Sequence, residues 1–209
     1  MVDAQDQEGP ERPLPHTESE GASGSATSEA TDEKPLPRDL KPMLATLGSD
    51  RNLDTMPTDE WSFEGKWDGI RAIAEVTDGK VLLHSRTGRD LTATYRELAS
   101  IGDALADHEA ILDGEIVTLD PSGVTSFSAL QNRSGLRKKT EIDAAAQNYP
   151  AELYVFDLLQ LDGSSLLRHP YTDRRRALEE LASTTGLTVP PRLEGDAPAC
   201  TTGMSTVRP

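Results

Sequence analysis

Alternation of apolar and polar residues in the middle of the chain predicts antiparallel strands joined by tight turns. Residues 71–76 alternate at the two-residue period of a half-buried strand, and residues 81–85 follow after a short gap. The gap contains Asp78-Gly79, a dipeptide that favours the left-handed backbone of a two-residue hairpin turn. The pattern therefore predicts a β-hairpin over residues 71–85.

Two further apolar runs have the length of buried strands. Residues 110–119 form the first, although Asp113-Gly114-Glu115 places two carboxylates inside it. Residues 153–159 form the second, and Asp162-Gly163 closes it with another turn signal. We expect both in the sheet, and the weaker strand candidates are residues 62–66 and 187–193.

Helical spacing occurs in three segments. Leu98, Ile101 and Leu105 share one face of a helix within residues 95–105. Ser126 is placed to cap a short helix over 127–133, and Thr172 to cap one over 173–182 that ends before Gly186. Strands and helices without an internal repeat predict a mixed α+β domain dominated by antiparallel hairpins.

The first 34 residues differ from the rest in composition. They hold nine acidic and two basic residues, with Gly, Ser and Pro and few large apolar side chains. Such a segment buries too little apolar surface to offset the entropy of ordering, so we predict a disordered acidic tail over residues 1–37. It lacks the features of a signal peptide, no stretch has the length of a membrane span, and the chain has one cysteine, Cys200. We therefore expect a cytoplasmic protein without a membrane partner.

Net charge gives no indication of nucleic-acid binding. The chain carries −15 in total, and the nine acids and two bases of the tail leave −8 for the remainder. Proteins that bind a phosphate backbone usually show a cationic surface. Here that surface is restricted to a local patch, for which the candidates are Arg133, Arg137, Lys138 and Lys139.

The stretch Glu64-Gly65-Lys66-Trp67-Asp68-Gly69-Ile70-Arg71 is the strongest candidate for chemistry. An amine attacks phosphorus only in its neutral form, so a nucleophilic lysine needs desolvation or a neighbouring cation. Gly69 allows a sharp turn or a close ligand, and Arg71 offers a fork suited to phosphate or ribose. The alternative is an exposed Lys–Asp pair at a turn, but K-x-D-G-x-R is a rarer pattern than K-x-D.

Three other places have both a functional and a structural interpretation. Arg86 and Arg89 follow the hairpin and either bind a ligand or are solvated turn residues. Glu115 lies in an apolar strand, where a carboxylate needs a partner, and either holds Mg²⁺ or a ribose hydroxyl or forms a salt bridge. Phe156 either stacks on a base or belongs to the core. No P-loop is present, so ATP would be held in another way.

Four motifs, taken together and in this order, resemble the adenylation domain of ATP-dependent DNA ligases. They are the lysine motif, Ser85-Arg86-Thr87-Gly88, Asp113-Gly114-Glu115 and Phe156-Asp157. That superfamily also contains RNA ligases and mRNA capping enzymes. The resemblance is strongest to the bacterial end-joining ligases and runs from Lys41 to Gly195. It implies an α+β, antiparallel-sheet-rich nucleotidyltransferase domain of ATP-grasp-like type.

The resemblance also implies a reaction and its residues. Lys66 would attack the α-phosphate of ATP, with Mg²⁺ or Mn²⁺, to form lysyl-AMP. The AMP would then pass to the 5′-phosphate of nicked or broken double-stranded DNA, in DNA repair and recombination, beside end-joining repair proteins. By this similarity Glu64 contacts adenine, Arg71 and Arg86 hold ribose or phosphate, Glu115 takes ribose or metal, and Phe156 stacks on adenine.

The C-terminal end departs from the family pattern. The family continues with Glu-Gly-apolar-apolar-x-Lys, a Lys-x-Lys segment and an oligonucleotide-binding (OB-fold) barrel. Here Asp196-Ala197-Pro198 follows Glu194-Gly195, and no lysine occurs after Lys139. We therefore expect an adenylation domain over 38–195 that is incomplete at its C-terminus, a non-family end over 196–209, no OB-fold domain, and impaired activity.

Two alternatives remain open. The chain is a non-catalytic nucleotide-binding remnant or interaction module, or it is an RNA ligase or capping-type nucleotidyltransferase. Labelling with ATP or GTP and the use of RNA or DNA acceptors would separate them.

Overall fold

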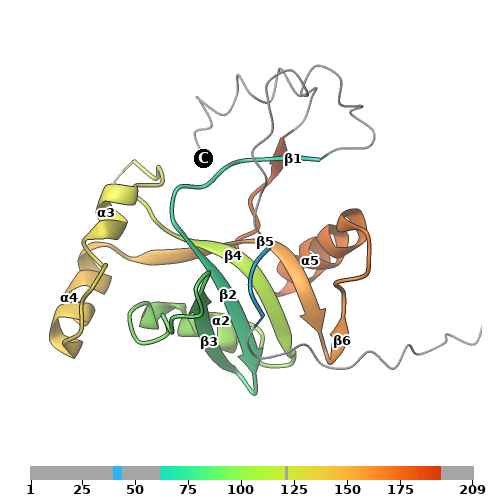
Figure 1. Cartoon of the computed structure of the whole chain (residues 1–209), viewed down its shortest axis with the longest axis horizontal. Coiled ribbons are helices and arrows are strands. Elements are labelled where there is room, and N and C mark those ends of the chain that lie inside the picture. Colours follow the sequence, from blue (N-terminus) through green and yellow to red (C-terminus); the bar gives the residue numbers. More distant parts are fainter. Residues whose placement is uncertain (1–39, 44–61, 121, 194–209) are drawn as a thin grey trace, which may run out of the picture. The chain divides into compact units, whose positions relative to one another are not determined.

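A five-stranded antiparallel sheet organises the part of the chain that the structure, a computed structural model, describes: residues 40–43, 62–120 and 122–193. Its strand order is β3-β2-β4-β5-β6 (Figure 1). The strands are β2 (Ile70–Thr77), β3 (Lys80–Ser85), β4 (Ala110–Thr118), β5 (Ala151–Leu161) and β6 (Ser164–Ser165). A separate two-stranded sheet pairs β1 (Phe63–Glu64) with β7 (Arg192–Leu193). The predicted acidic tail and the C-terminal end from residue 194 lie outside the described residues.

The hairpin turn predicted at Asp78-Gly79 and the turn predicted at Asp162-Gly163 are confirmed. Asp78 and Gly79 join β2 to β3 with φ values of 50° and 66°. Asp162 and Gly163 join β5 to β6 with φ values of 48° and 82°. Two successive residues of positive φ match the right-handed twist of the paired strands, which explains the preference for Asp-Gly here.

The helices agree with the sequence pattern less closely. Residues 95–105 divide into a 3₁₀ helix, η1 (Arg96–Ala99), and α2 (Ser100–Ala104). Ser126 caps α3 (Phe127–Gln131) as predicted, because its hydroxyl accepts from the Ala129 N–H at 3.3 Å. The prediction for Thr172 is wrong: α5 (Tyr171–Thr185) begins two residues before the predicted start, with Pro170 at the N-cap position, and ends at Gly186 with φ 73°. The pattern did not predict α4 (Lys139–Asn148), of which only Ile142 is buried.

The five-stranded sheet has two different faces. Ala72, Ala74 and Val76 of β2 belong to the main core, which Leu98 of η1 and Leu178 of α5 complete on the helical side. Ile73 points to the opposite face, in a small cluster with Ile111 and Leu159 against which Leu40 packs. The alternation of β2 therefore places Arg71, Ile73 and Glu75 on the face away from the main core.

A buried arginine ties η1 to the segment before β5. Arg133 is fully buried and donates to Glu97 at 2.5 and 3.1 Å, and to the carbonyls of Thr94 and Tyr149 at 2.7 and 2.8 Å. Its guanidinium also lies 5.1 Å from the centre of the Tyr95 ring. Arg133 is therefore a structural residue and does not belong to the surface patch that the sequence suggested.

None of the described helices is long and apolar enough to cross a membrane.

Candidate nucleotide site

Lys66 lies in the loop between β1 and β2, which connects the two-stranded sheet to the five-stranded sheet. Its side chain is 77% exposed, and its Nζ is 3.9 Å from Oδ1 of Asp68, which is also exposed. Gly69 ends the loop and donates its N–H to Oε1 of Glu115 on β4 at 3.1 Å. A Cβ at Gly69 would lie 2.2 Å from the carbonyl oxygen of Ile116, so only glycine allows this approach of the loop to β4.

Arg71 is the first charged residue of β2 and has a fixed orientation. Its Nε and Nη2 donate to the two carboxylate oxygens of Asp113 at 2.6 and 2.8 Å. The guanidinium carbon is 4.3 Å from the centre of the Phe156 ring. Burial raises the pKa of Asp113, although the hydrogen bonds from Arg71 act in the opposite direction. One edge of the Arg71 guanidinium is thus occupied by Asp113 and one face by Phe156, and no hydrogen bond from its Nη1 is found among the described residues.

A β-bulge in β5 places Phe156 on this face. Gly114 pairs with Val155 while Asp113 pairs with Asp157, so Phe156 has no partner in β4. Bulges re-aim side chains beside functional sites. Asp157 is in turn held by Arg174 of α5 through two bonds of 2.8 and 2.7 Å. The bulge therefore explains how a hydrophobic strand presents both a core face and an aromatic site residue.

Glu115 lies beside Arg71 and the Lys66 loop. Burial raises its pKa, while the Gly69 N–H, Arg71 and Lys66 lower it. The described residues contain no group of three or more His, Cys, Asp or Glu arranged to hold a metal. Mg²⁺, however, is commonly bound by one or two carboxylates together with substrate phosphates and water. A single accessible carboxylate fits that mode of binding and does not fit a protein-only cage.

Glu64 and Phe156 line the same small pocket. The pocket also includes Gly65, Trp67 and Arg175. The Trp67 ring is held edge-on against Tyr154, with 4.9 Å between ring centres. Oε1 of Glu64 accepts from the Tyr171 hydroxyl at 2.6 Å and from Nη1 of Arg175 at 3.0 Å. The pocket is narrow, about 10 Å³, so a flat heterocycle would have to separate the aromatic walls to enter, and the carboxylate would then accept a hydrogen bond from it.

Arg86 and Arg89 occupy an exposed turn after β3. The Ser85 N–H donates to the Arg89 carbonyl at 2.9 Å, and Gly88 has φ 80°. Within the described ranges, no hydrogen bond or ion pair joins Arg86 to Arg71, Glu115 or Phe156. Of the six residues proposed from sequence, the structure thus gathers five around the Lys66 loop and leaves Arg86 on the neighbouring turn.

Sequence reasoning missed Tyr171 and Arg175. Arg175 is the centre of three consecutive arginines on α5, and only it is buried, at 2% exposure. Its position three residues before Leu178 and six before Leu181 places it on the buried stripe of the helix. This helical spacing indicates that Arg175 is buried. It does not indicate which carboxylate the buried arginine contacts.

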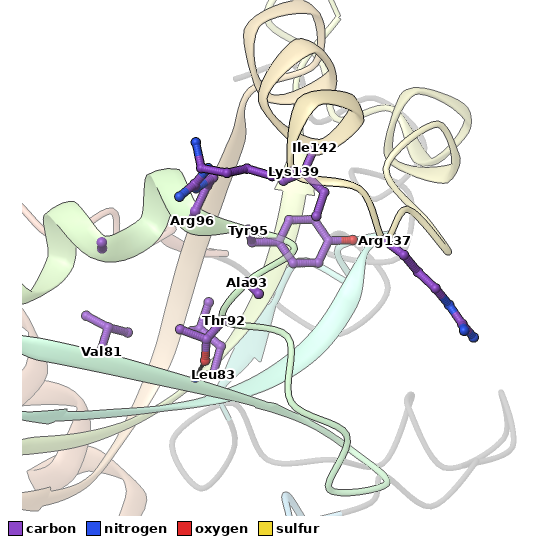
Figure 2. A pocket seen from close by; sticks show the side chains of 10 residues that line it. Val81, Leu83, Thr92, Ala93, Tyr95, Arg96, Arg137, Lys139 and Ile142 are labelled. Atoms are coloured by element: carbon purple, nitrogen blue, oxygen red, sulfur yellow. Dashed lines mark hydrogen bonds between the residues drawn. The ribbon is translucent and has the colours of Figure 1, made fainter.

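A larger cavity lies beside β3, an edge strand of the sheet. It has a volume of about 530 Å³ and an apolar floor that includes Val81, Leu83 and Tyr95. Arg96, Arg137 and Lys139 form its rim, and Arg137 extends outward from it (Figure 2). Arg96 and Lys139 both donate to Asp143 of α4. The cavity therefore combines an apolar floor with a cationic rim.

Comparisons with known proteins agree with the sequence resemblance. The profile of the family described as ATP dependent DNA ligase domain matches residues 42–191. Over 157 residues the chain is 49% identical to the multifunctional non-homologous end joining DNA repair protein LigD of Mycobacterium tuberculosis. Over 162 residues it is 45% identical to the corresponding protein of Mycolicibacterium smegmatis. These matches cover 75% and 78% of this chain but only 19% of each relative.

A solved structure shows the same fold. Mycobacterial DNA ligase D complexed with ATP and MES superposes with a TM-score of 0.70 and 44% identity, covering 81% of this chain and 52% of that one. The chain thus spans about a fifth of the curated relatives it matches and about half of the solved ligase chain. The match over 42–191 includes every residue of the site described above, and the chain therefore belongs to the family of ATP-dependent DNA ligase domains.

Proposed function

We propose that this chain carries the adenylation site of an ATP-dependent DNA ligase, with Lys66 as the nucleophile and ATP as the nucleotide. The observation that carries the proposal is the shared pocket of Glu64 and Phe156 directly beside the Lys66 loop. A related ligase with the same fold was solved with ATP. Phe156 and Trp67 would enclose the adenine ring, and Glu64 would accept a hydrogen bond from its amino group.

The reaction at Lys66 is a phosphoryl exchange. The lone pair of Nζ forms a bond to the α-phosphorus, the bond to the bridging oxygen breaks, and pyrophosphate leaves. The amine must lose a proton before or during this step. Arg71, which Asp113 and Phe156 hold in place, would stabilise the negative charge on the phosphate oxygens. Because Lys66 is exposed here, bound nucleotide has to exclude water from it.

Glu115 is the residue that would hold Mg²⁺ or Mn²⁺. The metal, when bound, neutralises phosphate charge and orients the pyrophosphate leaving group. The structural role of Glu115 does not depend on metal, because its Oε1 already anchors the Gly69 N–H. Arg86 would approach ribose or phosphate from its exposed turn.

DNA is the acceptor that we propose for the AMP group, in end-joining repair. The chain is acidic overall, so its phosphate contacts must be local. Arg137, Lys138 and Lys139 are consecutive exposed cations beside the larger cavity. These three residues, which we call the α4 cationic edge, would contact the DNA backbone. We also propose that the chain acts beside end-joining repair proteins, as the names of its longer relatives suggest. Its proposed location is the cytoplasm.

Transfer of label from ATP tests the proposal. Incubation with α-labelled ATP and Mg²⁺ should label the chain at Lys66, and Lys66→Ala should abolish the label. Lys80→Ala is the matched control, because Lys80 is exposed at the distant β2–β3 turn. Absence of label on the unchanged protein, despite measurable ATP binding, would contradict autonomous adenylation.

The pairing of the exposed Lys66 with Asp68 favours one alternative, a module that binds nucleotide without turnover. ATP binding with no label on Lys66 would support that alternative. A preference for GTP, or for RNA over nicked DNA as acceptor, would instead indicate a capping-type enzyme or an RNA ligase.

A further inference from the structure

A buried arginine and a tyrosine of α5 converge on one oxygen of Glu64. Arg175 uses all three of its guanidinium nitrogens: Nη1 donates to Glu64 at 3.0 Å, Nε donates to Glu179 at 2.8 Å, and Nη2 donates to the carbonyl of Pro190. The Tyr171 hydroxyl donates to the same Glu64 oxygen, Oε1, at 2.6 Å. Glu64 is thus fixed by two donors that are four residues apart on one helix.

These contacts place two donors on one oxygen of Glu64. A carboxylate oxygen accepts hydrogen bonds, and Tyr171 and Arg175 present an O–H and an N–H group to it. Burial and the hydrogen bond to Glu64 raise the pKa of Tyr171 to about 12, so the tyrosine remains a donor. Both bonds end on Oε1, and within the described part of the chain no side-chain hydrogen bond reaches Oε2 of Glu64, which lines the pocket.

The pocket adjoining Glu64 has the walls of a base site. Trp67, Phe156 and Arg175 line it together with Glu64, and the pocket is narrow, about 10 Å³, so a base would have to separate these walls to enter. Adenine presents an amino donor at its six position, where guanine presents a carbonyl acceptor. A carboxylate that lines the pocket attracts the first and repels the second.

We propose that Tyr171 and Arg175 are positioning residues that hold Glu64 as a fixed acceptor and so make this site select adenine over guanine. The inference rests on the proposed nucleotide site. It deepens that proposal by assigning base selection to two residues that do not touch the reacting phosphate.

The test compares binding of the α,β-methylene analogues of ATP and GTP, with Mg²⁺, by calorimetry. These analogues need no reaction at Lys66. Tyr171→Phe removes one donor and should lower the ratio of ATP-analogue to GTP-analogue affinity by about tenfold, the usual effect of one hydrogen bond to a charged group. Glu64→Gln should lower it further, because an amide can donate to the guanine carbonyl. Tyr149→Phe, on a tyrosine without a bond to Glu64, should leave the ratio unchanged.

The outcomes separate the two proposals. If the unchanged chain binds neither analogue, the proposed nucleotide site is wrong and this inference falls with it. If the chain binds the ATP analogue and Tyr171→Phe and Glu64→Gln both keep the original ratio, base selection does not depend on this network and only the inference is overturned. Arg175→Lys serves as a second check if it folds, with the exposed Arg176→Lys as its control.

Discussion

Arg71 and Asp113 form a two-point ion pair across β2 and β4, with Nε–Oδ1 and Nη2–Oδ2 distances of 2.6 and 2.8 Å. The side chain of Asp113 is 5% exposed and that of Arg71 is 33% exposed. The pair therefore connects a buried carboxylate to a guanidinium that solvent or a ligand can reach. Such a fork has one orientation, which pre-aligns the free edge of the guanidinium. The relationship makes Asp113 a support for Arg71 and explains why an acidic residue lies inside an apolar strand.

Asp113→Asn should therefore weaken both the fold and the site. The amide has the same shape but cannot accept both arginine N–H groups, and we expect a loss of about 1–3 kcal/mol in the free energy of unfolding. If the proposed adenylation occurs, its rate should also fall, because Arg71 loses its fixed orientation. Urea unfolding measures the first effect and ATP labelling the second. Asp103→Asn, on an exposed position of α2, is the control and should change neither.

The Arg133–Glu97 pair should make a large contribution to stability that depends on both partners. Arg133→Met removes the N–H groups that donate to Glu97 and to two backbone carbonyls. We expect the free energy of unfolding to fall by about 3–5 kcal/mol. Glu97→Met alone leaves the buried cation unpaired. The double variant should be more stable than the sum of the single effects predicts, as measured in a double-mutant cycle by urea unfolding. Additive effects would contradict this interpretation of the pair.

Glu97 also predicts a dependence of stability on pH. Burial by itself raises the pKa of Glu97, but hydrogen bonds from Arg133 and from the Ala151 N–H outweigh it, so the pKa is lowered from 4.5. A carboxyl with a lower pKa in the folded state binds fewer protons there than in the unfolded chain. Its stabilising contribution is therefore present above 4.5 and is lost as pH falls through the folded value. Glu97→Gln should flatten this part of the acid unfolding curve, and an unchanged slope would be evidence against it.

The sequence predicted those features that depend on local patterns. Alternation indicated the β2–β3 hairpin, and Asp-Gly marked the turns that follow β2 and β5. The motif residues Glu64, Arg71, Glu115 and Phe156 were found from their order and type, and they lie around the Lys66 loop. Local order was sufficient because these residues lie at strand ends or on neighbouring strands of one sheet.

Contacts between distant segments were not predictable in this way. Arg175 and Glu64 are separated by 111 residues, and no local pattern indicates that they meet. Arg133 was assigned to a surface patch because a basic residue near other basic residues usually faces water. Its burial depends on Glu97 and two carbonyls that come together only in the folded chain. The α4 helix was missed because its sequence offers one buried apolar residue rather than a periodic stripe.

Gly69→Ala should displace the Lys66 loop. Its Cβ would lie 2.2 Å from the Ile116 carbonyl oxygen and 2.9 Å from Cγ of Glu115, so the loop must move away from β4. We expect loss of the Gly69–Glu115 hydrogen bond and a fall of at least about tenfold in labelling of Lys66 by ATP. Gly123→Ala is the comparison, because its φ of 82° imposes backbone strain while its Cβ meets nothing within 4 Å. Similar labelling defects in both variants would indicate a general loss of stability rather than displacement of the loop.

The α4 cationic edge predicts how DNA affinity depends on salt. Removing one cation that binds a phosphate should reduce the slope of log affinity against log salt by about 0.9. Lys138 and Lys139 already pair with Glu141 and Asp143 at 3.1 Å each.

Arg137→Gln should therefore weaken binding to nicked duplex DNA more than Lys139→Gln does, because the carboxylate of Asp143 offsets part of the Lys139 charge. Both effects should be the same for all DNA sequences, since the phosphate backbone carries no base identity. Arg168→Gln changes the net charge equally but lies in the loop after β6, at the opposite edge of the sheet from β3. Fluorescence anisotropy over a salt series measures all three variants. An equal reduction of slope in Arg137→Gln and Arg168→Gln would show that total charge, rather than this edge, attracts the DNA.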